Sequence, residues 1–120
     1  MKTRKILSLI SALMLALAAP ASLAEGLALT DMAGREITLD APATRVIALN
    51  PADCEILYAL GAEDVLVGRG EYCNYPEAVL ELPSVNSGAE TNIEQILALE
   101  PDVIVMSKMA QTVEQVEALE

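Results

Sequence analysis

The sequence predicts an α/β fold built on a parallel sheet, preceded by a β-hairpin and a signal peptide. After residue 45, short apolar runs alternate with helical patterns, which is typical of a parallel sheet with crossover helices. Before that point, two short apolar runs flank a set of turn residues at 31–34, as in a hairpin. The first residues are basic and are followed by a long apolar run, as in an export signal.

The signal peptide is predicted to occupy residues 1–24. Three basic residues precede an apolar run at 6–19, and Ser22 and Ala24 are the small residues expected before a cleavage site. The apolar run is shorter than the ~20 residues that a membrane-spanning helix needs. No Cys lies near the cleavage point, so we expect a mature chain that is free in the periplasm, with residues 25–120 forming one lobe.

The chain is strongly acidic, with a formal net charge of −11. Three of its seven basic residues lie in the signal peptide, which leaves four against eighteen acidic residues. Nucleic acids and anionic lipids are bound through basic patches, so this balance argues against both as partners. The acidic residues either favour encounter with a basic partner or keep an exported protein soluble, and both explanations stay open.

The first half of the expected fold follows from local patterns. The hairpin covers 27–39, and a Pro-containing linker at 41–44 leads to the first core strand at 45–49. Pro51 suits the first turn of a helix, and Gly61 is typical of the residue that ends one.

The second half continues the alternation of strands and helices. We expect a strand at 65–68, a short helix at 76–82 and a short strand at 83–86. A helix at 92–99 and a strand at 102–106 follow.

The last helix and strand carry the clearest boundary signals. Thr91 and Glu94 fit the T-x-x-E pattern of a capping box, and Pro101 stops the helix. The apolar run at 103–106 predicts a strand covered on both sides. Residues 111–120 read as a helix without a stop signal, so we expect the fold to continue beyond them.

Three segments in the same order carry a family resemblance: RVIALNPADCEILYALG at 45–61, VLVGRGEYCNYP at 65–76 and TNIEQILALEPDVIVM at 91–106. They resemble the periplasmic substrate-binding proteins of ABC importers for cobalamin and iron-siderophores, the Fe/cobalamin periplasmic-binding domain family. The resemblance implies the incomplete N-terminal lobe of a two-lobed periplasmic binding protein. Such a protein captures a metal chelate and delivers it to an ABC permease and its ATPase. It implies no catalysis, no cofactor and no resident metal.

Ligands of a parallel α/β sheet bind beyond the carboxyl ends of the strands. That rule selects four loops of this chain, at 50–54, 69–75, 86–91 and 107–110.

The family resemblance makes Tyr72 the first ligand-binding candidate, because the first Tyr of the matching loop touches the ligand. An aromatic ring offers a rigid apolar face and a hydroxyl group. Tyr75 is a weaker candidate, and both rings have the alternative of packing under their loop. Gly88 stands nearest to a position where cobalamin binders carry a Trp, so a stacking ring is absent here.

Arg69 and Lys108 are cations in two of the four loops and could bind an anionic ferric siderophore. Ordinary solvent exposure is the alternative for both. Pro51, in the first loop, completes the predicted ligand-binding set.

Glu94 has two interpretations. As the third residue of a capping box, it would satisfy backbone donors at the helix start. In the family that the chain resembles, the Glu at this place projects from the lobe and pairs with an Arg of the permease, a contact that a carboxylate can make in bidentate form. The two roles are compatible.

Cys54 and Cys73 are a disulfide candidate, because two cysteines in an oxidising compartment are often paired. Cys54 has the alternative of being a small buried residue at a helix start. The pair also supports a competing function, an exported α/β thiol-redox protein or enzyme. The absence of His and of a C-x-x-C spacing argues against that function.

Overall fold

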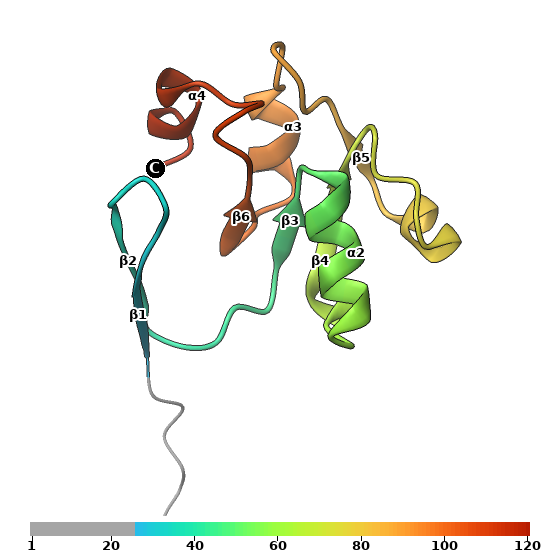
Figure 1. Cartoon of the computed structure of the whole chain (residues 1–120), viewed down its shortest axis with the longest axis horizontal. Coiled ribbons are helices and arrows are strands. Elements are labelled where there is room, and N and C mark those ends of the chain that lie inside the picture. The colour runs from blue at the N-terminus through green and yellow to red at the C-terminus, as the bar shows by residue number, and fades with distance from the viewer. Residues whose placement is uncertain (1–25) are drawn as a thin grey trace, which may run out of the picture.

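The computed structural model describes residues 26–120, so the predicted signal peptide at 1–24 lies outside the described part (Figure 1). The predicted hairpin is confirmed. Strands β1 (Leu27–Thr30) and β2 (Glu36–Leu39) pair antiparallel. The Asp31 carboxylate accepts hydrogen bonds from two backbone N–H groups of the turn, which fixes the turn geometry.

The main sheet is parallel throughout, as predicted. Its four strands lie in the order β5-β4-β3-β6. They are β3 (Val46–Ala48), β4 (Leu66–Gly70), β5 (Ser84–Val85) and β6 (Val103–Val105). Figure 1 shows the hairpin standing apart from this sheet and approaching α4 (Val113–Glu117) at its turn.

Helix α2 (Pro51–Ala59) connects β3 with β4, and α3 (Ile93–Ala98) connects β5 with β6. Pro51 begins α2, as predicted. Gly61 follows its end with a φ of 71°, a left-handed conformation that favours Gly. The predicted short helix near residue 80 is a 3-10 helix at Glu77–Glu81, and another 3-10 turn at Glu63–Val65 precedes β4. Within the described residues, no helix is long and apolar enough to cross a membrane.

The two helices cover opposite faces of the sheet (Figure 1). Val46 and Ala48 of β3 pack with Cys54 of α2 on one face. Ile47 of the same strand packs with Ile96 of α3 on the other face. Alternate residues of one central strand therefore belong to two separate apolar clusters, one on each face of the sheet.

Strand β6 differs from its prediction. All three of its residues are half-buried rather than covered on both sides. The reason is position, because β6 lies at an edge of the four-stranded sheet and, among residues 26–120, pairs with β3 alone.

The predicted capping box at the start of α3 is wrong. The cap is Asn92, whose side chain accepts a hydrogen bond from the backbone N–H of Gln95 at 3.0 Å. Thr91 is buried instead, and its hydroxyl donates to the Gly88 carbonyl oxygen at 2.6 Å. A complete capping box does form at α4, between Thr112 and Gln115.

Candidate functional site

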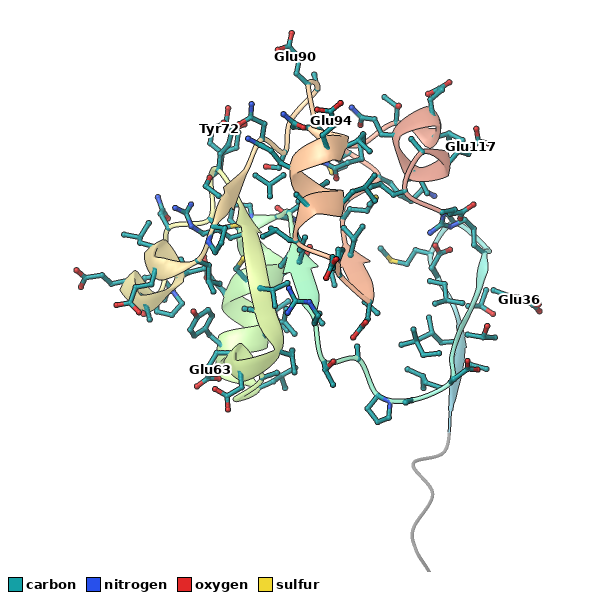
Figure 2. The ribbon with its side chains drawn as sticks, turned by 180° about the vertical axis from the view of Figure 1, so that it is seen from behind. Glu36, Glu63, Tyr72, Glu90, Glu94 and Glu117 are labelled. Carbon is teal, nitrogen blue, oxygen red and sulfur yellow. The ribbon has the colours of Figure 1, made fainter. Side chains whose placement is uncertain are left out.

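The four loops predicted from the strand ends do meet at one end of the parallel sheet. In Figure 2 the labelled side chains of Tyr72 and Glu94 lie at the same end of the molecule, with Glu63 at the opposite end. A Cβ on Gly70, the last residue of β4, would collide with the Leu49 carbonyl oxygen and the Ser87 hydroxyl. Only Gly therefore lets the strands come so close where the loops begin.

Tyr72 and Tyr75 are both solvent-exposed, each with 66% of its surface accessible. They lie in the loop that links β4 to the 3-10 helix, and the Tyr75–Pro76 peptide bond is cis. The alternative that both rings pack under the loop is therefore not what the structure has. Each ring is free to receive an apolar partner.

Arg69 lies inside β4, whereas the sequence placed it in a loop. Its guanidinium donates to the Cys73 carbonyl oxygen at 3.1 Å and more weakly to that of Gly70. Its Nε is buried without a partner. Because these bonds hold the loop after β4 to the strand, the structure gives Arg69 a scaffolding contact, and its predicted contact with a ligand stays a prediction.

The other predicted ligand residues differ in what surrounds them. Gly88 is half-buried with open space where a side chain would stand. Lys108 is exposed, with its Nζ 3.4 Å from the Met32 carbonyl oxygen of the hairpin turn. Pro51 is half-buried in the first turn of α2. These three residues follow three different strands at the carboxyl end of the parallel sheet.

A cavity of about 740 Å³ lies between the hairpin turn, the loop after β6 and α4. Of the predicted ligand residues, it includes Lys108. Asp53 also lines it, and burial raises the pKa of that carboxyl group while a hydrogen bond from Asn50 opposes the rise. The cavity is of a size that small-molecule sites have, and most of its lining residues are polar or charged, with Met and Val side chains among them.

Gln111 is a site residue that the sequence analysis missed. Its side chain is buried and bridges two loops: its amide NH₂ donates to the Ser87 carbonyl oxygen at 2.7 Å, and its amide oxygen accepts from the Ser107 N–H at 3.0 Å. Gln115 adds a second link, to the Ala89 carbonyl oxygen. The T-x-x-Q pattern at 112–115 signals the helix cap, but no local signal marks the bridge.

Glu94 is exposed on the first turn of α3. No hydrogen bond or ion pair within residues 26–120 holds its carboxylate, since the cap is made by Asn92. Figure 2 shows the labelled Glu90 and Glu94 projecting at the end of the molecule where Tyr72 lies. This end therefore presents free acidic side chains beside an exposed aromatic ring.

Cys54 and Cys73 are both completely buried, and no disulfide joins them in this structure. Buried thiols of this kind are poorly placed to react with a substrate. That placement disfavours the competing function of a thiol-redox enzyme.

Both the parallel α/β lobe and its clustered loops agree with the comparison to known families. The model of the periplasmic binding protein family matches residues 46–120, and the chain belongs to this family.

Vitamin B12-binding protein of Vibrio cholerae is 48% identical over 64 residues, which are 53% of this chain and 23% of that protein. The crystal structure of periplasmic vitamin B12-binding protein from the same organism matches with a TM-score of 0.59 and 42% identity, over 65% of this chain and 31% of that one. A periplasmic heme-binding protein from Pseudomonas aeruginosa matches with a TM-score of 0.62 and 28% identity, over 65% and 28% of the two chains. The chain spans about a quarter of the length of the curated relatives it matches.

Proposed function

We propose that this chain supplies one lobe of a periplasmic solute-binding protein that captures a metal chelate for an ABC importer. The observation that carries the proposal is the exposed Tyr72 ring at the carboxyl end of a parallel sheet, in a chain of the periplasmic binding protein family. Relatives named for vitamin B12 support a cobalamin-type chelate. A ferric siderophore is the second candidate ligand for the same site.

The flat face of Tyr72 suits a planar macrocycle. A ring with 66% of its surface accessible gains contact when a corrin covers it, and its hydroxyl can orient polar edge groups. The open space at Gly88 leaves room for a wide ligand beside the neighbouring loop. Lys108, on the loop after β6, adds a positive charge that suits anionic groups of the chelate.

The variant Tyr72→Ala tests this role in the full-length natural protein that contains residues 25–120. Titration calorimetry with cobalamin, a ferric siderophore and heme identifies the chelate, and the same chelate is then titrated into the variant. We expect an affinity loss of roughly 5-fold or more, because stacking on one aromatic ring contributes about 1 kcal/mol or more.

Tyr75→Ala is a matched control for Tyr72→Ala, because Tyr75 has the same exposed fraction on the same loop. We expect it to lose less affinity for the chelate than Tyr72→Ala does, because Tyr75 is the weaker of the two ligand-binding candidates. Equal affinities for the wild type and Tyr72→Ala would remove Tyr72 from the site. A chain that binds none of the three chelates would contradict the proposed ligand class.

We further propose that Glu94 docks the loaded protein on the permease. Its carboxylate is exposed and without a partner in residues 26–120, so it can pair with an Arg of another protein without first breaking an internal contact. The strongly acidic composition supports encounter with a basic surface of that protein. The ATPase is the other expected partner, as the subunit that works with the permease.

A further inference from the structure

Two cysteines from different elements meet in the core on the α2 face of the sheet. Cys54 lies in the first turns of α2, and Cys73 lies in the loop after β4. Both belong to the apolar cluster that includes Ala48 and Val79. The chain between them contains most of α2 and all of β4, so a link between the sulfurs would close a loop around that unit.

One backbone atom shows how close the two sulfurs are. The Cys54 Sγ lies 3.6 Å from the Ala48 carbonyl oxygen, and the Cys73 Sγ lies 3.8 Å from the same oxygen. Both side chains therefore point to the same spot at the end of β3. A disulfide needs this convergence of side-chain directions.

The surroundings leave the two thiols with each other as partners. Both residues are completely buried, and within residues 26–120 no group of three or more His, Cys, Asp and Glu side chains is arranged to hold a metal ion. Hydrogen bonding to Cys73 and burial raise the pKa of the Cys54 thiol. Hydrogen bonding from Cys54, with help from Gly70 and the Arg69 charge, lowers the pKa of Cys73.

We propose that Cys54 and Cys73 form an intramolecular disulfide that fastens the Tyr72 loop to α2. The bond joins the two Sγ atoms and releases two protons and two electrons, which an external disulfide oxidant accepts as it is reduced to two thiols. Because both sulfurs are buried in the folded chain, the bond forms before the core closes. The proposal rests on export to an oxidising compartment and is independent of which ligand is bound.

The sequence provides a direct test, because trypsin cleaves after Arg69, between the two cysteines. The protein is purified from the periplasm, denatured with N-ethylmaleimide to block free thiols, and digested without a reductant. We expect peptides 46–69 and 70–108 to appear joined in one mass, and to separate after reduction. Separate peptides that each carry a maleimide, or either peptide joined to another cysteine, would overturn the proposal.

A stability measurement supplies a second readout. A reductant should lower the Tm of the wild type by several degrees, because it frees the closed loop in the unfolded chain. Cys54→Ala and Cys73→Ala should each lose this sensitivity to reductant. A wild type whose Tm is the same with and without reductant, after the reductant has had time to act on the unfolded chain, would also overturn the proposal. A protein that binds its chelate but yields separate peptides would reject the disulfide and leave the proposed function intact.

Discussion

Removing the Gln111 side chain should loosen two loops at the site at the same time. Gln111→Ala deletes the donor to the Ser87 carbonyl oxygen and the acceptor for the Ser107 N–H. A hydrogen bond of this kind contributes about 1 kcal/mol net, so the two together stabilise the closed loops by about 2 kcal/mol. Since 1.4 kcal/mol corresponds to a factor of ten, both loops should open roughly 30-fold more often.

Gln111→Glu sharpens the test, because it keeps the shape and the acceptor but loses the donor. The ionised carboxylate would face the Ser87 carbonyl oxygen, and burial disfavours the charged form. The folded-state pKa of the new Glu is therefore raised above its unfolded value. The variant should be least stable at neutral pH, where the unfolded Glu is ionised and folding must either take up a proton or bury a charge, and it should recover as the pH falls below the raised pKa.

The assay is hydrogen exchange followed by mass spectrometry over segments 84–91 and 106–112 at several pH values. Glu117→Ala is the control, because Glu117 is exposed on α4 and lies outside the bridge. Exchange in both segments that is unchanged by Gln111→Ala would refute the bridge. If exchange in the Gln111→Glu variant does not slow down again in acid, the loss of the hydrogen-bond donor to Ser87 is not what destabilises the loops.

Two further predictions concern charged side chains. Glu94→Gln should impair transport in reconstituted vesicles while leaving chelate affinity unchanged. The expected loss in the free energy of docking on the permease is ~2–5 kcal/mol for a desolvated ion pair and ~0–1 kcal/mol for an exposed one. Unchanged transport would leave Glu94 without a docking role. Hydrogen bonds from the Thr44 N–H and hydroxyl and from the Arg45 N–H hold the pKa of Asp102 below its ordinary value of 3.8. The Asp102 charge therefore stabilises the fold above that value and stops doing so as the pH falls through the lowered pKa. Asp102→Asn should lower the Tm at pH 7, and the difference from wild type should close in acid; a difference independent of pH would contradict the assignment.

The order of strands and helices was predictable because each signal is local. Pro51 and Gly61 bracket α2 by their own backbone preferences, and both predictions are confirmed. The start of α3 was not predictable in the same way, because T-x-x-E at Thr91 and N-x-x-Q at Asn92 overlap by one residue. Tertiary packing decides between them, since the Thr91 side chain is buried and bonded to Gly88.

The site was only partly predictable for a related reason. The rule of strand ends places the loops without any knowledge of side chains, and the loops do meet. The rule does not give the exact end of each strand. Strand β4 extends through Gly70, so Arg69 lies in the strand and not in the loop. Nor can the rule find Gln111, because the bridge joins loops about two dozen residues apart in the sequence.

The two-sided packing of β3 makes this strand intolerant of a shift in register. An insertion of one residue before Ile47 would turn every following side chain to the other face. Ile47, now against α3, would be driven into the space that small Ala48 leaves for the two cysteines, and Ala48 would leave a void beside Ile96. An insertion in the linker before Thr44 leaves the facing of the β3 side chains unchanged, because the hairpin lies outside the four-stranded sheet. We therefore expect insertions to be tolerated before β3, whereas an insertion within β3 disrupts both apolar clusters.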